Sequence, residues 1–151
     1  MTLVIAAPVS GEIIPMRDVP DPVFSAMMVG PGAAIAPFPG GLTVVAPCAG
    51  TVRKVQAHGV LIDSGDGMGV LVHLGLDTCE LDGEGFDVLV KDGQEVTQGQ
   101  PLVLWNTSVA TEEGYSLCSP IVVVGADKNA VSIVAEGPKV EAGKPFLHVE
   151  Q

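Results

Sequence analysis

Aromatic residues are scarce in this sequence, and so are residues of positive charge. Phe, Trp and Tyr make up only 4% of the 151 residues, so a hydrophobic core must be built from aliphatic side chains. Seven Lys and Arg residues against eighteen Asp and Glu residues leave a formal net charge of −11. This balance argues against binding to nucleic acid or to an anionic membrane surface, because both attract basic proteins. A basic protein partner would be attracted, although the same acidity can serve solubility alone.

Cysteines are few as well. Cys48, Cys79 and Cys118 are widely spaced, odd in number and form no CxxC pair, so we expect no disulfide framework and a reducing compartment. No apolar run approaches the roughly 20 residues of a membrane-spanning helix. The first residues, Met1 to Pro8, lack the basic region of a secretory signal. These absences predict a cytoplasmic protein without direct membrane insertion.

What the sequence has in quantity is glycine and proline, spread along the whole chain. Nineteen glycines and twelve prolines without a dense cluster predict many short strands joined by turns. The length is that of one ordinary domain. We therefore expect residues 1–151 to form a single domain, and a monomer.

Two internal repeats support this expectation. Residues 7–13 and 46–52 share the pattern A-P-x-x-G-x-[IV], which predicts a turn feeding a strand. Residues 93–102 and 137–146 share G-x-x-V-x-x-G-x-P-[LF]. Duplicated units of this kind are typical of a compact β-sandwich.

Short β-rich runs occupy much of the remaining sequence: 43–46, 51–55, 60–63, 70–74, 102–105, 121–124, 131–134 and 146–149. Single helical turns are expected at Asp21-Pro22, where Asp would cap the helix and Pro would follow it, and near residues 84–90. The expected fold class is all-β, an antiparallel sandwich or flattened barrel. It would contain internal repeats (a duplicated hybrid motif) and a few helical turns.

The most informative segment contains two histidines. Apolar runs of equal length, 58–63 and 68–73, flank a four-residue turn-forming stretch and predict a hairpin. If Asp63 pairs with Met68, then His58 pairs with His73. Directly opposed residues have Cβ atoms about 4.5–5.5 Å apart and share one face of the sheet. A slip of one residue would send the two side chains to opposite faces.

Two adjacent imidazoles suit the transfer of a phosphoryl group. A neutral imidazole nitrogen is nucleophilic near pH 7 and can carry the group covalently. The second histidine can donate a hydrogen bond to a phosphoryl oxygen, and backbone N–H groups at residues 74–76 can donate others. Gly75 would allow close approach of the backbone. His148, the third histidine, is expected to be a strand residue without a chemical role.

The residues around His73 resemble the glucose-type enzyme IIA family of the bacterial phosphoenolpyruvate-dependent sugar phosphotransferase system. Residues 71–78 read LVHLGLDT and residues 80–86 read ELDGEGF, similar to the signature around the phosphorylated histidine of that family. The resemblance extends from residues 7–11 to 143–145. Residues 18–24 also resemble the family, in a part of its partner-facing rim.

The resemblance implies that His73 accepts phosphate from the carrier protein HPr and passes it to a cysteine of a sugar-specific enzyme IIB. His58 would support the phosphoryl group and its onward transfer. No cofactor is implied. The family usually has Thr shortly before the second histidine and Ala after it, whereas residues 56–59 here read QAHG, after a shorter loop.

The resemblance also implies a partner-facing surface. Its members would be the apolar residues Val23, Phe24, Val29 and Leu71, the acidic residues Asp21 and Asp77, and Cys79 where the family usually has valine. Asp21 and Asp77 would face basic residues of HPr and of the IIB/IIC permease.

Other functions fit these residues less well. His58 and His73, even with Cys79, supply fewer convincing ligands than an intrinsic zinc site needs, although a target protein could complete a zinc site at an interface. A metallopeptidase would need an H-x-H pair, which residues 148–150 do not supply. A biotin or lipoate carrier would present a lysine at a hairpin tip, where neither Lys54 nor Lys91 is expected. A regulator that binds permeases or kinases stays open, as does the sugar.

Overall fold

The computed structural model describes residues 2–151, and strands dominate it. The strands are β1 (Thr2–Ala6), β2 (Gly11–Pro15), β3 (Gly32–Pro37), β4 (Gly41–Val45), β5 (Gly50–Gln56), β6 (Gly59–Gly65), β7 (Met68–His73), β8 (Phe86–Val88), β9 (Glu95–Val96), β10 (Pro101–Asn106), β11 (Ser119–Val124), β12 (Val131–Ile133), β13 (Lys139–Val140) and β14 (Pro145–Glu150). The helices are η1 (Met16–Asp18), α1 (Pro22–Ser25), η2 (Thr78–Leu81) and α2 (Thr107–Glu112). The predicted all-β class with short helical turns is confirmed.

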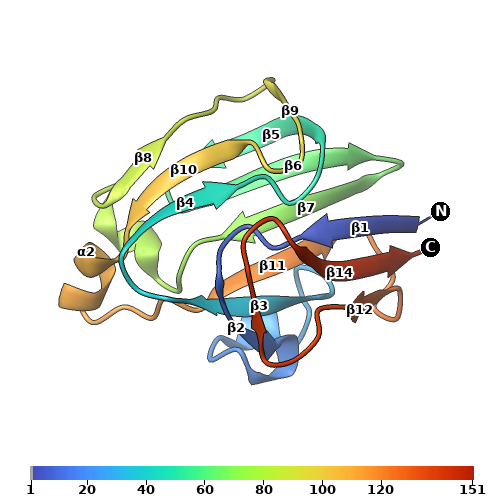
Figure 1. Cartoon of the computed structure of the whole chain (residues 1–151), viewed down its shortest axis with the longest axis horizontal. Coiled ribbons are helices and arrows are strands. Elements are labelled where there is room, and N and C mark those ends of the chain that lie inside the picture. Colours follow the sequence, from blue (N-terminus) through green and yellow to red (C-terminus); the bar gives the residue numbers. More distant parts are fainter. Residues whose placement is uncertain (1) are drawn as a thin grey trace.

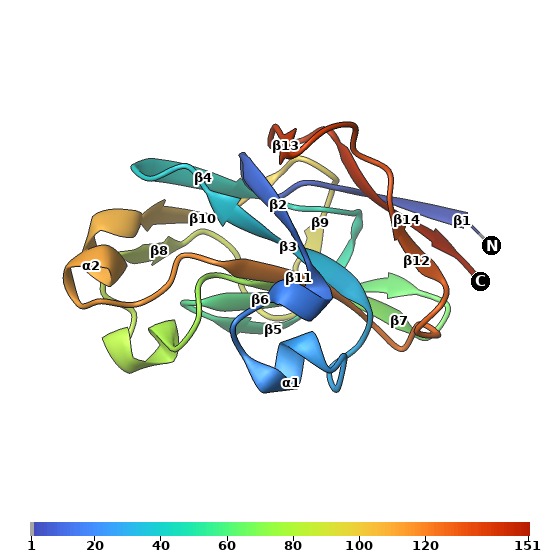
Figure 2. The same ribbon diagram turned by 90° about the horizontal axis from the view of Figure 1, so that it is seen from below.

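The strands form three antiparallel sheets. One has eight strands in the order β13-β2-β3-β11-β7-β6-β5-β9, and the others are β1-β14-β12 and β4-β10-β8. Figures 1 and 2 show the two small sheets on one side of the large one, as in a sandwich, with both termini at the same end. None of the sheets described for residues 2–151 closes into a barrel.

The internal repeats of the sequence are repeats of structure. β1 and β2 flank the first A-P-x-x-G segment as β4 and β5 flank the second, and β13–β14 correspond to β9–β10. Equivalent hydrogen bonds recur: the amide of Ala7 donates to the carbonyl of Lys144 (2.9 Å), and Ala46 donates to Gln100 (2.8 Å). The two repeats also bond to each other in a symmetric way: the amide of Ala6 donates to the carbonyl of Pro47, and the amide of Val45 donates to the carbonyl of Pro8, each at 2.9 Å.

The core lies between the large sheet and the two small ones. It is built mainly from aliphatic side chains, as the low aromatic content requires, with Trp105 and Phe146 as its largest fully buried members. Trp105 stacks on Phe86 with ring centroids 5.5 Å apart, which ties β10 to β8. Such close-packed burial of apolar surface is the main favourable term in folding.

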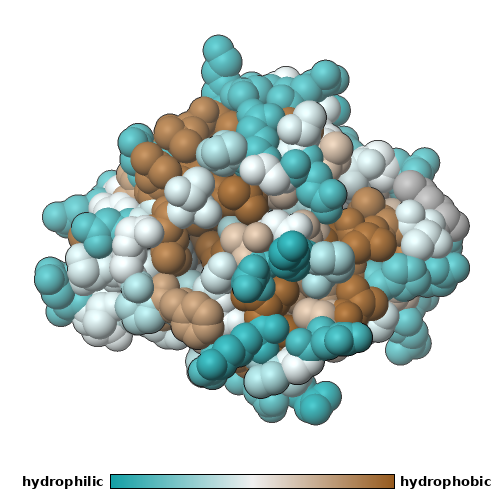
Figure 3. Space-filling view, in the orientation of Figure 1, coloured by the Kyte–Doolittle hydropathy of each residue, from teal (hydrophilic) through white to brown (hydrophobic). Residues whose placement is uncertain are grey.

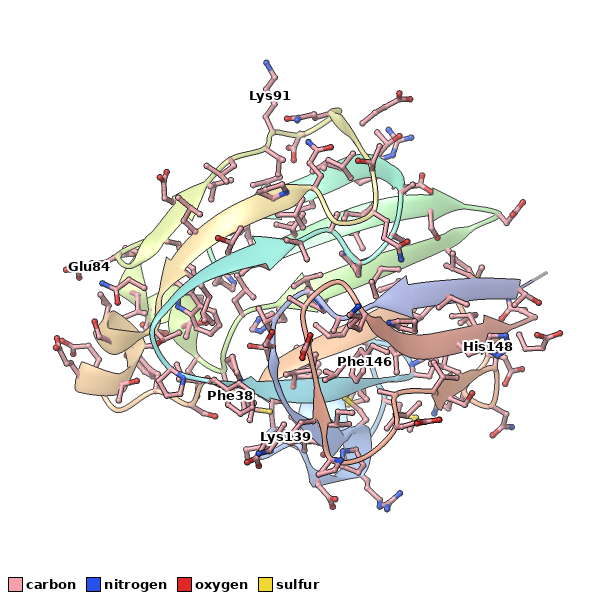
Figure 4. All side chains as sticks on the ribbon, viewed as in Figure 1. Phe38, Glu84, Lys91, Lys139, Phe146 and His148 are labelled. Carbon is pink, nitrogen blue, oxygen red and sulfur yellow. The ribbon has the colours of Figure 1, made fainter. Side chains whose placement is uncertain are left out.

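Side chains on the outer faces of the small sheets include exposed apolar ones. Val4 on β1 and Leu104 on β10 are each more than 40% exposed, and Figure 3 shows hydrophobic surface over both sheets. Lys139 on β13 lies over the ring of Phe38, 5.8 Å from its centroid, and Figure 4 shows the two side chains near each other. His148 lies within β14, as predicted.

The expected helical turn near residues 84–90 is wrong. Residues 86–88 form strand β8, which pairs with β10 and places Phe86 against Trp105. The turn before it contains Gly83 and Gly85, both at positive φ (88° and 90°), a conformation that ends helices rather than propagating them. Tertiary packing of Phe86 therefore outweighs the local helical pattern. Helices η1, η2 and α2 and strands β1, β3 and β8 were not among the segments predicted from sequence.

Within residues 2–151, no helix is long and apolar enough to cross a membrane.

Candidate functional site

The outer face of the large sheet carries a second, smaller hydrophobic cluster. Alternate residues of β11 serve different cores: Ile121 and Val123 face the interior, while Val122 packs outside with Met16, Val19 and Leu76. This arrangement explains why β11 reads as a continuous apolar run. The outer cluster also holds Phe24 and Val29, and so fixes α1 and the segment after it against the sheet.

Helix α1 is a single turn with a well-formed start. Asp21 is its N-cap, and its carboxylate accepts hydrogen bonds from the amides of Val23 (2.9 Å) and Phe24 (3.4 Å). Pro22 follows in the first turn, as the sequence predicts. The cap and the outer cluster together place the Phe24 ring 5.1 Å, centroid to centroid, from that of His73.

The predicted pairing of His58 with His73 is wrong by one residue. His73 pairs with Gly59, and Asp63 pairs with Gly69 rather than Met68. The turn is shorter than expected because only Asp66 and Gly67, at φ 55° and 77°, separate the strands. An irregularity between Asp63 and Gly65 adds a residue to β6 and shifts the register.

The two histidines meet in spite of this shift. His58 belongs to the turn between β5 and β6, so the strict alternation of a strand does not govern its side chain. Its carbonyl accepts a hydrogen bond from the amide of Leu74 at 2.7 Å, just beyond β7. The two imidazole rings lie 5.2 Å apart, centroid to centroid, and edge to face at 75°. The predicted proximity of His58 and His73 is therefore confirmed, by a different local geometry.

A hydrogen bond fixes the tautomer of His73. Its Nδ1 lies 2.7 Å from the carbonyl oxygen of Gly75. A carbonyl oxygen can only accept, so Nδ1 carries the proton and donates. In the neutral ring, Nε2 then has the free lone pair and is the nucleophilic nitrogen.

The carbonyl of Gly75 is itself held in place. The Gly75 amide donates to Ser119 Oγ at 3.1 Å, and the buried hydroxyl of Thr78 donates to the carbonyl of Leu74 at 2.6 Å. Gly75 has φ 80°, and a Cβ there would lie 2.9 Å from the carbonyl oxygen of Ser116. Only glycine fits this position without strain. The turn after β7 is thus built to orient one imidazole.

Burial keeps both rings neutral. Desolvation is the main cause that lowers the pKa of His73 below its usual value of 6.5, and the neighbouring His58 lowers it further. The Gly75 carbonyl and the carboxylates of Asp21 and Asp77 oppose this shift without reversing it. The pKa of His58 is also lowered by burial. At pH 7 both imidazoles are therefore mostly unprotonated.

The histidines border a depression of about 310 Å³ on the outer face of the sheet. Its lining residues are Val29, Lys54, Gln56, His58, Gly59, Leu61, Leu71, His73 and Val124. The depression is mainly apolar, with the two imidazoles and two longer polar side chains at its border. The lining thus places two imidazoles, both with lowered pKa values, beside aliphatic side chains.

The chain matches over residues 3–129 the family described as phosphoenolpyruvate-dependent sugar phosphotransferase system, EIIA 1. It belongs to this family. Its curated relatives include the glucose-specific EIIA component of Staphylococcus aureus strain COL, 43% identical over 150 residues, which cover 97% of this chain and 89% of the relative. The fold matches that of the glucose permease IIA from Mycoplasma capricolum with a TM-score of 0.85 and 31% identity, over 99% of this chain and 97% of that one.

Some relatives carry an EIIA region within a longer protein. The glucoside-specific EIICBA component of Staphylococcus carnosus strain TM300 is 40% identical over 148 residues, which are 97% of this chain but only 21% of the relative. The resemblance inferred from residues 71–86 is thus confirmed, and this chain is an EIIA component of the phosphotransferase system.

The apolar residues predicted for the partner surface of this EIIA component gather around His73. Phe24 contacts its ring, and Val29 and Leu71 line the depression. Val23, beside Phe24 on α1, is 44% exposed. Met28, which follows shortly after α1, is 73% exposed and was not among the residues predicted for this surface.

The polar residues of the predicted surface are not among those that line the depression. Asp21 caps α1, and Asp77 precedes η2 in a left-handed conformation (φ 60°). Both act electrostatically on His73. Cys79 is exposed on η2, and no contact described for residues 2–151 links it to the histidines.

A metal site of this EIIA component would need more ligands than the depression offers. Among residues 2–151, no group of three or more His, Cys, Asp or Glu side chains could hold a metal ion.

Proposed function

We propose that this EIIA chain is a phosphocarrier in which His73 accepts a phosphoryl group from phospho-HPr and passes it to a cysteine of a sugar-specific enzyme IIB. The observation that supports the proposal best is the hydrogen bond from Nδ1 of His73 to the Gly75 carbonyl, which leaves Nε2 free. In the first step, Nε2 attacks the phosphorus atom, its N–P bond forms, and the N–P bond to the HPr histidine breaks. In the second, the IIB thiolate attacks and the phosphoryl group leaves Nε2.

His58 assists this transfer without being the nucleophile. Its ring lies 5.2 Å from that of His73, close enough for its N–H to donate to a phosphoryl oxygen. Phosphoryl transfer requires little of a protein besides in-line positioning and charge stabilisation. His58 can supply the hydrogen-bond donor, and the fixed tautomer of His73 directs Nε2 to the phosphorus atom, so the two histidines meet this requirement.

The partner surface consists of an apolar centre and an acidic rim. Val23, Phe24, Val29 and Leu71 pack against HPr or IIB, while Asp21 and Asp77 attract basic residues of those partners. Cys79 lies beside this rim. The chain works as a cytoplasmic monomer, and residues 1–151 form one EIIA domain that serves a IIB/IIC permease. Regulation of permeases or kinases, and a zinc site completed by a target, stay predictions.

The proposal is tested by incubation with phosphoenolpyruvate, enzyme I and HPr, followed by intact mass spectrometry and site mapping. The wild type should take one phosphate, labile to acid and stable to base. His73→Ala should take none, whereas His148→Gln, a matched histidine control on β14, should behave as the wild type. Labelling that persists in His73→Ala, or a phosphate mapped to a serine, would contradict the proposal.

A further inference from the structure

Strand β5 forms one wall of the depression beside the histidines, and it contributes Lys54 and Gln56. These residues are two apart on a strand and so face the same side of the sheet. Gln56 pairs with Gly59, which pairs with His73, so the three lie in one row across the strands. Lys54 occupies the next row, through Leu61.

The middle position of the first row is open. Gly59 has no side chain, and even a Cβ there would remain 4.0 Å from Cδ2 of His73. Neighbouring strands are 4.7–4.9 Å apart, which puts the Cα atoms of Gln56 and His73 about 10 Å apart. An extended glutamine side chain on one strand and a phosphorylated imidazole on the other can together span this gap. The space above Gly59 is therefore available to a group carried on Nε2.

The charge of a phosphoryl group needs compensation in this position. Such a group carries about −1.5 to −2 charges at pH 7. Asp21, the cap of α1, and Asp77, which precedes η2, already act on His73, and His58 in the β5–β6 turn is mostly neutral. Lys54 is the only cationic side chain among the residues that line the depression. The adjacent Arg53 is paired with Asp63, at 3.2 Å.

We infer that Lys54 and Gln56 form a cradle for the phosphoryl group on His73, the ammonium by its charge and the side-chain amide by donating a hydrogen bond. The inference rests on the proposed function of His73. Both are positioning residues, because they hold the transferred group and do not exchange a bond with it. They also define what this site recognises: a dianionic group that projects from Nε2 across Gly59 toward β5.

The test uses the full chain, phosphorylated with phosphoramidate, so that no partner protein contributes. Nε2 displaces ammonia from the phosphorus atom, and the phosphorus NMR signal that disappears in His73→Ala identifies the site. A nearby cation and a donor both favour the dianion. Lys54→Met should therefore raise the phosphoryl pKa by about half a unit, Gln56→Ala by less, and Lys54→Arg should restore the wild-type value.

A matched control is Lys91→Met, which removes an exposed lysine that projects from the edge of the molecule (Figure 4) and should leave the phosphoryl pKa unchanged. Phosphoryl pKa values of Lys54→Met and Gln56→Ala equal to the wild-type value would overturn the inference alone. If His73 of the wild type takes no phosphate from phospho-HPr, the proposed function fails and the inference fails with it.

Discussion

At the scale of single residues, the hydrogen bond between Nδ1 of His73 and the Gly75 carbonyl leaves Nε2 as the nitrogen that the proposed function needs as its nucleophile. The carbonyl fixes the tautomer, and Ser119 and Thr78 fix the turn that carries the carbonyl. Burial lowers the pKa of His73, so the reactive neutral form dominates at pH 7. The opposing pull of Asp21 and Asp77 is weaker than desolvation.

Replacement of His58 separates acceptance of phosphate from its onward transfer. We expect His58→Gln to accept phosphate from HPr but to pass it to enzyme IIB more slowly by about a hundredfold or more, since the loss of a positioned acid has effects of this order. Rapid-quench kinetics of each half-reaction measure the two rates. Wild-type transfer to IIB by this variant would make His58 a bystander.

The lowered pKa values of both histidines also predict how stability depends on pH. Above the unfolded value of about 6.5, both rings are neutral in both states and contribute nothing. As the pH falls below 6.5, the unfolded chain binds protons first, so the free energy of unfolding decreases until the lowered folded pKa values are reached. A His58→Gln, His73→Gln double variant lacks this loss.

Urea unfolding at pH 7 and about pH 5 measures the difference. The wild type should lose more stability over this interval than the double variant, because the carboxylates that also titrate are common to both. An equal loss in the two proteins would mean that the folded-state pKa values of these histidines are not lowered.

The sequence predicts which residues meet at this site better than it predicts how they meet. His58 and His73 were identified from equal spacing about a turn, yet the actual register is one residue different. The irregularity after Asp63 shifts the register by one residue, and the two histidines still meet because His58 lies in a turn and not in the strand. Neither feature follows from the periodicity of the sequence. The role of the Gly75 carbonyl depends on a tertiary contact with Ser119, 44 residues away.

At the scale of elements, α1 connects the outer hydrophobic cluster with His73. A four-residue helix has little stability of its own. It depends on the Asp21 cap at one end and on the packing of Phe24 and Val29 against Val122 and Leu76. Whatever loosens α1 therefore disturbs the apolar wall beside His73.

Two substitutions at Asp21 distinguish its cap from its charge. Asp21→Asn keeps an oxygen that can accept from the amides of Val23 and Phe24 but removes the negative charge, whereas Asp21→Ala removes both. We expect Asp21→Ala to lower the free energy of unfolding by about 1 kcal/mol and Asp21→Asn by only a few tenths. Thermal and urea unfolding measure this. Equal losses in the two variants would show that the cap contributes nothing beyond charge.

The elements themselves were largely predictable where a turn signal and a β-branched run coincide. Every run predicted as a strand is one, and the A-P-x-x-G segments lead into β2 and β5. The prediction failed at residues 84–90, where residues 86–88 form strand β8 in place of a helical turn because Phe86 packs on Trp105. Strand β3, rich in alanine, lacks the strong β propensity that would reveal it and is stabilised by its neighbours β2 and β11.

At the scale of the whole molecule, the histidine site lies on one side of the duplicated sandwich, and the small sheets lie on the other side. Helix α1 and the β5–β6 pair lie on the side away from β4 and β13 (Figure 2), so the histidine site is presented outward. The residues that line it are mainly apolar, and Asp21 and Asp77 act electrostatically on His73. The net charge of −11 adds a long-range attraction for basic partners.

This charge predicts a salt-dependent encounter with HPr. The association rate should fall as salt rises, and Asp77→Asn should show a weaker dependence, since the screening length is about 8 Å at physiological ionic strength and only charges near the contact matter. Phe24→Ala should instead accelerate dissociation. Stopped-flow rates across a salt series separate these effects. A flat response of the wild type would mean that the acidity serves solubility only.

The central claim is that His73 carries the phosphoryl group on Nε2, and NMR of the phosphorylated protein labelled with nitrogen-15 in its histidines tests it most directly. The chain is phosphorylated through enzyme I and HPr, and coupling between phosphorus and nitrogen identifies the bonded atom. We expect coupling to Nε2 of His73, with the Nδ1 proton still hydrogen-bonded to the Gly75 carbonyl. Coupling to Nδ1 of His73, or to either nitrogen of His58, would contradict the account.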